Sequence, residues 1–399
     1  MKTGWQTRPV GELLQQTETT NPSQSPEVEF DYVDVSSVSN TTFRIDRTQR
    51  LKGKDAPSRA RRLVKTNDVL FATVRPTLRR IAMVPEHLDG QVCSTGYIVL
   101  RPKAGLDPRF VFYWLFTEDF MAQMESLQKG ASYPAVTDGE VRAQAIPVPP
   151  VPDQERIVAI LDEAFAAIAA ARANAEQNLR NARELFEGYL QSVFLQTRDG
   201  WNEIQMEALA TFRNGINYTK GSRGERVKVV GVGEFQNHFW VPLDNLPVVT
   251  LDGKLSPSDA LRQGDILVVR SNGNPELVGR SVLVGEIGDK ITHSGFTIRI
   301  RLSGQDLLPK YLCHFLKSGA SRKKLSAAGT GINIKSVNQA TLSALTVPVP
   351  SVSEQAAIVG GLESLDAEIE RLVTTYQRKL DALDALKQSL LHQAFTGAL

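Results

Sequence analysis

Apolar residues recur every three or four positions along two long segments of the chain, 147–194 and 348–395. The apolar series includes Ile157, Leu161, Ile168 and Leu185 in the first segment, and Ile358, Leu362, Ile369, Leu372 and Leu383 in the second. Such spacing, sustained over about four heptads, is typical of a coiled coil. We therefore predict two long helices, each about 60 Å at ~1.5 Å per residue, that pair through these residues.

An alternative is that each helix lies separately on its own domain, but that arrangement needs a wider apolar stripe. We call the apolar series through which each helix would contact the other its seam. The seam of the first helix is rich in alanine and that of the second in leucine, so small and large side chains can face each other. Asn178 and Lys379 interrupt the seams and are candidates for setting the register of the pair. We favour an antiparallel pair, because the second helix then returns the chain to the first domain.

The two segments are copies of one another. A single offset, 348 − 147 = 201, aligns them without a gap and matches Gln154 with Gln355 and Phe194 with Phe395. Each copy begins with Pro-Val-Pro, which a helix interior does not accommodate, and we predict Asp153 and Ser353 as the N-caps. Because the repeat takes up half of the chain, it predicts two copies of a domain followed by a helix.

The remaining residues have the pattern of two mixed α/β domains. In the first, we predict strands at Phe30–Val38, Asp68–Val74 and Tyr97–Leu100, and one buried helix over Pro108–Leu127. The second repeats this plan with looser spacing: Asn67–Leu70 returns as Gly264–Leu267, and Ser94–Tyr97 as His293–Phe296. The predicted fold class is α+β, with two similar mixed α/β domains separated by a long antiparallel two-helix coiled coil and related by a pseudo-twofold axis. The predicted boundaries are 1–146 and 200–347 for the domains, and 147–199 and 348–399 for the helical spacers.

Composition adds little to this picture. The net charge of the 399 residues is only +2, so any surface that attracts an anionic partner has to be local. Cys93 and Cys313 are the two cysteines, and they match neither a disulfide framework nor a zinc spacing. Neither a signal segment nor an apolar run of about 18 residues is present. We expect a soluble cytoplasmic protein without a membrane partner.

A local basic segment lies between residues 44 and 80, where 12 basic residues face only three acidic ones. This density suits a surface that contacts phosphates, although a solvated surface is the alternative. The candidate contacts are Arg44, Arg47, Lys52, Lys54, Arg59, Arg75, Arg79 and Arg80.

A second set of candidates lies on loops. Arginine can read guanine with two hydrogen bonds and asparagine can read adenine, so Arg270, Asn272 and Asn274 are candidate base readers, with Arg280 beside them. A plain Asn-Gly turn is the alternative for this loop. A further loop in each domain offers Ser132 and Tyr133 in the first and Asn333 and Lys335 in the second.

We find no catalytic constellation in the sequence. The Asn-Pro pairs lack the continuation by which a DNA adenine methylase holds a flipped base, and no phosphate-binding loop is present. Asp252-Gly253-Lys254 lacks a preceding carboxylate partner, and the five histidines are scattered. We expect neither a catalytic site nor a metal site in this chain.

The doubled plan, with the junctions PVPPVPDQERIV and PVPSVSEQAAIV, the segments NDVLFATVRP and GDILVVRSNG, and the closing LLHQAFTGAL, resembles the specificity subunit of type I restriction–modification systems. The resemblance implies two target-recognition domains, each reading half of an interrupted site in double-stranded DNA, and helices that act as spacer and docking platform. It also implies two adenine-N6 methyltransferase subunits and motor-nuclease restriction subunits as partners. S-adenosylmethionine, ATP and Mg²⁺ would belong to those partners, with no cofactor in this chain. A stand-alone two-headed scaffold for proteins and a piece of a fused restriction–methylation enzyme are the competing interpretations.

Overall fold

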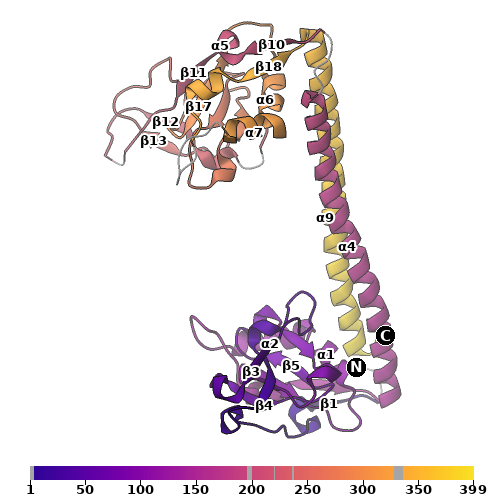
Figure 1. Ribbon diagram of the computed structural model, residues 1–399. Helices are drawn as coiled ribbons and strands as arrows, with labels where there is room; N and C mark the ends of the chain where they lie inside the picture. The colour runs from indigo at the N-terminus through magenta and orange to yellow at the C-terminus, as the bar shows by residue number, and fades with distance from the viewer. Residues whose placement is uncertain (1–3, 196–199, 220, 236–237, 328–335) are drawn as a thin grey trace. The chain divides into compact units, whose positions relative to one another are not determined.

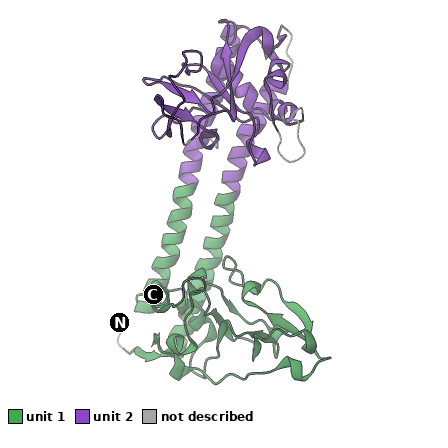
Figure 2. Ribbon diagram, turned by 90° about the vertical axis from the view of Figure 1, so that its left-hand side faces the viewer, with its two compact units in different colours: residues 1–176, 377–399 green, residues 177–376 purple. Residues whose placement is uncertain are grey.

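The computed structural model describes residues 4–195, 200–219, 221–235, 238–327 and 336–399. The chain forms two compact units, residues 1–176 with 377–399 (unit 1) and residues 177–376 (unit 2), as Figure 2 shows. Each unit contains one α/β domain together with part of α4 (Val151–Leu195) and part of α9 (Val352–Thr396). The predicted fold class, two mixed α/β domains with a pair of long helices, is confirmed.

The described residues of unit 1 form three sheets, whose strands are labelled in part in Figure 1. The largest has the order β3-β2-β7-β4 (Gln49–Lys52, Glu29–Val33, Val92–Ser94, Ala60–Leu63), with β2 and β7 parallel. The second has the order β6-β5-β8 (Ile81–Met83, Val69–Ala72, Tyr97–Leu100), and its strands are antiparallel. The third pairs β1 (Gln6–Pro9) with β9 (Ala145–Val148).

Unit 2 repeats most of these ladders. The order β13-β12-β16 (Val248–Thr250, Arg226–Val230, Ile291–His293) again contains one parallel pair, and β10 (Asn202–Gln205) pairs with β18 (Thr346–Val349). The sheet β11-β17-β14-β15 (Ala210–Asn214, Thr297–Leu302, Ile266–Val269, Ser281–Leu283) matches β8-β5-β6 but gains β11 as an edge strand. The two domains therefore share a sheet framework and differ at its edges.

The ladders correct the predicted repeat by one residue. Tyr97 pairs with Ala72 in unit 1, and Thr297 pairs with Val269 in unit 2. The backbone position equivalent to Tyr97 is therefore Thr297, so that Phe296 corresponds to Gly96. The sequence match was wrong because it aligned two aromatic residues across a turn in which the two domains differ.

Three predicted elements of unit 1 are shorter than expected, among them the strand predicted at Asp68–Val74, which is limited to β5 (Val69–Ala72). The strand predicted at Phe30–Val38 ends at Val33, since the Asp34 amide donates to Ser37 Oγ at 3.0 Å and the chain turns into η3 (Val35–Ser37). The single helix predicted over Pro108–Leu127 is two helices, α1 (Pro108–Trp114) and α2 (Glu118–Leu127). Thr117 separates them, because its hydroxyl donates to the Trp114 carbonyl while its Oγ1 accepts from the Phe120 amide at the start of α2.

The long helices begin earlier than predicted. Pro147 and Val148 belong to β9, and α4 starts at Val151, so Asp153 lies inside the first turn and is not the N-cap. Likewise α9 starts at Val352, which places Ser353 inside the helix. The Ser351 hydroxyl accepts from the Glu354 amide at 3.3 Å and takes the role predicted for Ser353.

Within each unit α4 and α9 run side by side in opposite directions (Figures 1 and 2). In unit 1, Arg156 donates to the Leu399 carbonyl at 2.9 Å, and further along α4 Arg172 pairs with Asp384 at 2.6 Å. In unit 2, Asn178 donates to the Tyr376 hydroxyl at 3.0 Å. Asn178 therefore makes an interhelical contact, as expected of a residue that sets register.

The predicted seam is only partly correct. Ile157, Leu161, Ile168, Leu362 and Ile369 are buried and Ile358 and Leu383 are half-buried, but Leu185 is 59% exposed and Leu372 is 42% exposed. A straight α-helix drifts by about 20° per heptad from a strict 3.5-residue repeat. The buried stripe therefore moves by one position, to Phe186 in place of Leu185 and to Leu380 in place of Lys379.

The ends of both helices belong to the domain cores. In unit 1 the core cluster includes Ile157 and Leu161 from α4 together with Leu391 and Phe395 from the end of α9. In unit 2 it includes the end of α4 and the start of α9. Matching ring pairs mark the two junctions, with centroid separations of 4.7 Å for Phe110–Phe395 and 5.4 Å for Phe194–Tyr311.

Candidate nucleic-acid interface

The basic segment of unit 1 divides into paired and unpaired side chains. Acidic residues from the preceding stretch neutralise part of it, because Arg50 pairs with Glu29 and Asp31 while Lys52 and Lys54 both pair with Glu27. Arg44, Arg47 and Arg59 are exposed, and within the described residues they have no ion pair at 4.0 Å or less. The unpaired members of the predicted phosphate-contacting set are therefore concentrated on loops rather than on β3.

Arg75, Ser132 and Tyr133, which the sequence offered on separate loops, lie together in unit 1. The Arg75 amide donates to the Pro134 carbonyl at 2.7 Å, and its Nη2 donates to the Ser132 carbonyl at 3.2 Å. The guanidinium lies 4.8 Å from the ring centroid of Tyr133, whose side chain is 71% exposed. The guanidinium offers several N–H donors for hydrogen bonds, and the exposed aromatic ring offers a flat surface on which a base can stack, so both kinds of contact are available at one place.

The loop that carries Arg75 is strained. Arg75 and Arg79 flank η5 (Pro76–Leu78), and both have left-handed backbone angles, with φ of 51° and 53°. Residues other than glycine rarely adopt this left-handed conformation. Where they do, the position is often part of a functional site. Arg80 serves a different purpose, since its Nη1 donates to the carbonyls of Val35 and Val38 and the side chain is half-buried.

In unit 2 Arg270 takes the backbone position of Thr73. The Arg270 amide donates to the Phe296 carbonyl at 2.8 Å, as the Thr73 amide donates to Gly96 at 2.9 Å. The Asn272 and Asn274 side-chain oxygens accept from the amides of Asn274 and Glu276, so one acceptor site of each oxygen holds the loop and the side-chain NH₂ groups are donors for a ligand. Arg280 Nε donates to the Glu276 carbonyl at 3.1 Å. Asn333 and Lys335 lie outside the described residues.

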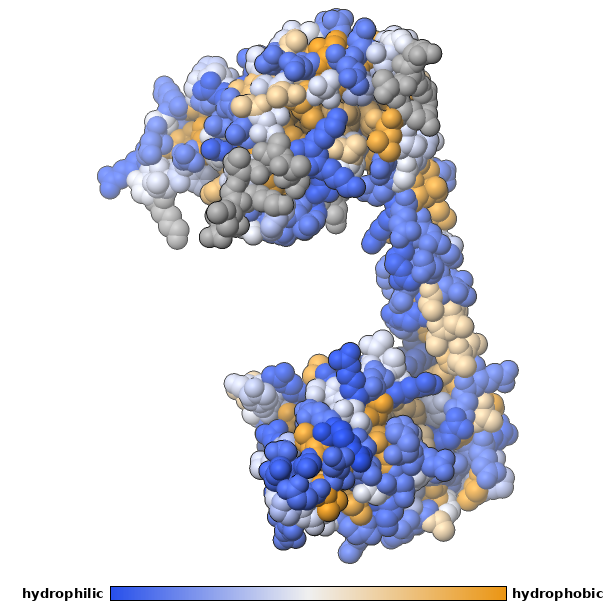
Figure 3. Space-filling model, viewed as in Figure 1, coloured by the Kyte–Doolittle hydropathy of each residue, from blue (hydrophilic) through white to orange (hydrophobic). Residues whose placement is uncertain are grey.

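Sequence reasoning missed Phe296, which is 61% exposed beside Arg270. The shifted alignment of the two domains paired Phe296 with the buried Tyr97 and so concealed it. On the face shown in Figure 3 hydrophilic residues predominate over both units, and hydrophobic residues form small separate patches. Each unit therefore exposes one aromatic side chain at its candidate interface, Tyr133 beside the Arg75 guanidinium in unit 1 and Phe296, whose carbonyl accepts from the Arg270 amide, in unit 2.

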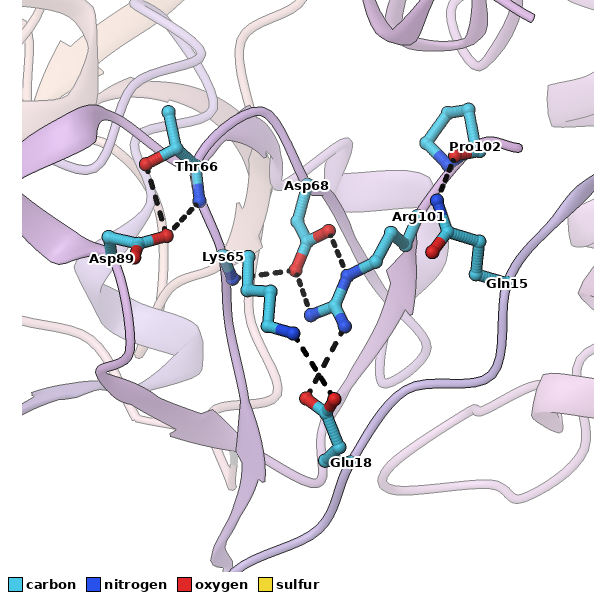
Figure 4. A network of polar contacts seen from close by, with 8 residues as sticks. All are labelled: Gln15, Glu18, Lys65, Thr66, Asp68, Asp89, Arg101 and Pro102. Carbon is cyan, nitrogen blue, oxygen red and sulfur yellow. Dashed lines mark hydrogen bonds and ion pairs between the residues drawn. The ribbon is translucent and has the colours of Figure 1, made fainter. Parts of the chain in front are cut away.

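A buried ion pair fixes the strand that leads into the Arg75 loop (Figure 4). Asp68, which is 1% exposed, accepts two hydrogen bonds of 2.8 Å from Arg101 at the end of β8 and one from the Lys65 amide. The bonds to Asp68 raise the pKa of Arg101. Glu18 accepts from both Lys65 and Arg101 at the surface. Unit 2 has the same arrangement in Asp265, Arg301 and the Arg262 amide.

Other titratable groups are buried. Burial raises the pKa of the Cys93 thiol to about 12 and that of Cys313 to about 11, and both thiols are free. Burial lowers the pKa of His293 to about 3, and its Nδ1 lies 2.9 Å from the Thr297 hydroxyl.

Within the described ranges, no group of three or more His, Cys, Asp or Glu residues is placed to hold a metal ion. Among the helices described, none has the length and apolar character needed to cross a bilayer.

A family model described as the type I restriction modification DNA specificity domain matches residues 2–177 and 212–377. The chain belongs to this family. The matched ranges cover most of both α/β domains, so the chain is a DNA-recognition subunit with two specificity domains, and a protein-only scaffold is not favoured.

Individual relatives agree with the family. The specificity subunit of the type I restriction enzyme StySPI from Salmonella potsdam is 25% identical over 321 residues, which cover 77% of this chain and 69% of that protein. The HsdS subunit from Thermoanaerobacter tengcongensis is 26% identical, with a TM-score of 0.66, and the match covers 100% of this chain and 98% of that chain. A chain solved for the complex assembly and conformational transition of the type I R-M system has a TM-score of 0.88 at 26% identity, covering 100% and 99%.

Proposed function

We propose that each domain reads one half of an interrupted site in double-stranded DNA and that the chain itself is not catalytic. One observation carries this proposal: the same backbone position next to the same turn holds Thr73 beside Gly96 in unit 1 and Arg270 beside Phe296 in unit 2. A shared framework with different side chains at equivalent loop positions is what two readers of unlike sequences require. Arg75, Tyr133, Arg270 and Asn272 are the proposed base-proximal residues.

The proposed partners are two adenine-N6 methyltransferase subunits and motor-nuclease restriction subunits, located with this chain in the cytoplasm. S-adenosylmethionine, ATP and Mg²⁺ would be bound by those partners. The names of the relatives, which are specificity subunits of multi-subunit restriction enzymes, support this assignment. The exposed outer faces of α4 and α9 leave polar surface for such partners within each unit.

Mapping methylated adenines in the host genome, with and without this gene, tests the function directly. We expect one interrupted motif to lose its methylation when the gene is deleted. DNA affinity of the purified complex should also fall steeply with salt, because each phosphate contact releases a counterion. An unchanged methylation map, or an affinity independent of salt, would contradict the assignment.

Arg270→Ala is expected to relax recognition in one half-site only, at a cost of roughly 1–3 kcal/mol if the guanidinium reads a base. Arg75→Ala should act on the other half-site. The measurement is methylation of a library of sites randomised in each half. Arg262→Ala, which removes an exposed arginine just before β14, is the matched control. A uniform loss over all sequences would instead make Arg270 a phosphate contact.

Seven residues inserted at matched points, after Glu176 in α4 and after Tyr376 in α9, are expected to lengthen the tolerated gap between half-sites. Seven helical residues add about 10 Å, which corresponds to roughly three base pairs at ~3.4 Å each. Methylation of substrates with graded gaps measures the shift. The same insertion in α4 alone makes the register of the Arg172–Asp384 pair incompatible with that of the Asn178–Tyr376 pair and should abolish methylation. An unchanged gap preference in the double insertion would refute the spacer role.

A further inference from the structure

Phe296 presents an exposed aromatic ring at the turn that leads into β17 of unit 2. Its side chain is 61% exposed, the largest value among the large hydrophobic side chains described in that unit. A single exposed phenyl ring is common on protein surfaces, so exposure alone does not mark a site. Phe296 differs from such a residue in the way its backbone is held and in the residue that lies opposite it.

Hydrogen bonds fix the turn on both sides of Phe296. The Phe296 amide donates to Ser294 Oγ at 3.3 Å, and the Phe296 carbonyl accepts from the Arg270 amide at 2.8 Å. The Thr297 amide donates to the Ser294 carbonyl at 2.9 Å and closes the turn. Because the backbone is already ordered, only the two side-chain torsions of the ring remain to be fixed when a ligand binds, which keeps the entropic cost of contact low.

A neighbouring loop of unit 2 packs directly on this turn. The Ile216 amide donates to the His293 carbonyl at 2.9 Å, and the Gly295 amide donates to the Ile216 carbonyl at 2.8 Å. A Cβ at Gly295 would lie 2.2 Å from the side-chain oxygen of Asn217, so a side chain at this position would displace Asn217. The ring of Phe296 therefore projects from a closely packed backbone.

Unit 1 has a glycine at the equivalent backbone position. The Gly96 carbonyl accepts from the Thr73 amide, as the Phe296 carbonyl accepts from the Arg270 amide. A Cβ at Gly96 would lie 2.6 Å from Val35 Cγ2, so the first domain has no room for a side chain there. The two domains therefore differ at this position in the way expected of a residue that distinguishes one half-site from the other.

Arg270, a candidate base reader, lies opposite Phe296 at the end of the ladder between β14 and β17. The ladder pairs Val269 with Thr297, and the bond from the Arg270 amide to the Phe296 carbonyl continues this register by one position. Residues opposite each other on antiparallel strands project from the same face, with Cβ atoms about 5 Å apart. Since base pairs are about 3.4 Å apart, a ring at this spacing can reach the base pair that the guanidinium contacts or the next one.

We propose that Phe296 is a specificity-determining residue that reads the C5-methyl group of a thymine in the half-site bound by unit 2. Recognition of a methyl group here rests on the proposed function, since it requires unit 2 to lie on DNA. Among the groups that base pairs expose in the grooves, the thymine methyl is the apolar one, and a phenyl ring, which lacks hydrogen-bonding atoms, distinguishes bases by contact with it. Arg270 and Asn272 supply hydrogen-bond donors, so the three side chains together provide polar and apolar contacts to base edges.

Replacement of thymine by deoxyuridine tests the proposal, because uracil lacks only the C5-methyl group. Each thymine of the recognised motif is replaced in turn, and binding of the purified complex to each duplex is measured by fluorescence anisotropy. We expect one replacement to weaken binding by roughly 3- to 10-fold, the effect of one buried methyl group. Phe296→Ala should weaken binding to the thymine duplex by at least the same factor and should no longer respond to that replacement.

Phe296→Leu keeps an apolar side chain and should keep part of the response to uracil, and it serves if binding by Phe296→Ala is too weak to measure. Val248→Ala removes a 50% exposed apolar side chain from β13 and is the matched control, which should respond as the wild-type complex does. Wild-type and Phe296→Ala responses that are equal at every position, or absent from both, would overturn the proposal. Motif-specific binding by the wild-type complex would then leave the proposed function intact, whereas its absence would overturn that function as well.

Discussion

Asp68→Ala is expected to destabilise unit 1 by roughly 3–5 kcal/mol, because it leaves the Arg101 guanidinium without its buried partner and with only the exposed Glu18. Asp68 receives three hydrogen bonds, two from Arg101 and one from the Lys65 amide, in a place closed to solvent. Water therefore cannot replace the lost carboxylate. The effect should be localised in β5 and β8, the strands that these two residues join.

Hydrogen exchange measured by mass spectrometry tests this prediction, since it separates unit 1 from unit 2. We expect protection of β5 and β8 to fall while β14 and β17 of unit 2 keep theirs. Glu18→Gln removes the exposed partner of the same arginine and should cost less than about 1 kcal/mol. Asp68→Leu with Arg101→Met should recover much of the loss, because no unpaired charge remains. Equal effects of Glu18→Gln and Asp68→Ala would contradict the buried-pair argument.

Gln154→Leu is expected to cost about 3 kcal/mol or more, because three backbone groups lose their partner in the interior. The fully buried amide of Gln154 accepts from the Asp107 amide at 2.8 Å and donates to the carbonyls of Gly105 at 3.0 Å and Pro149 at 2.8 Å. It thereby ties the start of α4 to the loop before α1. Leucine has a similar size but can make none of these bonds.

The duplicated chain supplies a replicate of this experiment. Gln355 makes the same three bonds in unit 2, to Leu308, Asp306 and Pro350, so Gln355→Leu should destabilise that unit to a similar extent. Gln123→Leu, at an exposed position of α2, should stay within about 0.5 kcal/mol. Limited proteolysis after urea titration provides the measurement for each unit. A loss below 1 kcal/mol in both units would show that water satisfies the exposed backbone groups.

Much of the architecture was predictable, because periodic patterns and duplication are properties of the sequence itself. The repeat identified the two domains and the two helices, and it singled out Gln154 and Gln355 by identity, while the antiparallel pairing was expected from the path of the chain. It did not reveal what these glutamines do. A sequence does not show whether a glutamine side chain is buried or exposed. The carbonyls of Gly105 and Asp306, which accept from Gln154 and Gln355, come from loops about 50 residues away in the chain.

The errors follow from tertiary effects on local patterns. Thr117 ends one helix and begins the next through two hydrogen bonds, in a stretch whose apolar residues read as one continuous helix. Leu185 and Leu372 fit a strict heptad but face solvent, since the drift of a straight helix over several turns does not show in a short window. At the candidate interface, the contact between Arg75 and Tyr133 joins loops far apart in the chain, so composition alone could not predict it.

The return of α9 to the first domain affects how the protein is made. Unit 1 consists of residues 1–176 and 377–399, and Phe395 near the very end packs on Phe110. After residue 176 leaves the ribosome, another 399 − 176 = 223 residues follow, which takes roughly 10–45 s at about 5–20 residues per second. The first domain to be synthesised is therefore the last to complete its core. A premature stop codon shortly before Leu391 would damage the N-terminal domain more than the C-terminal one.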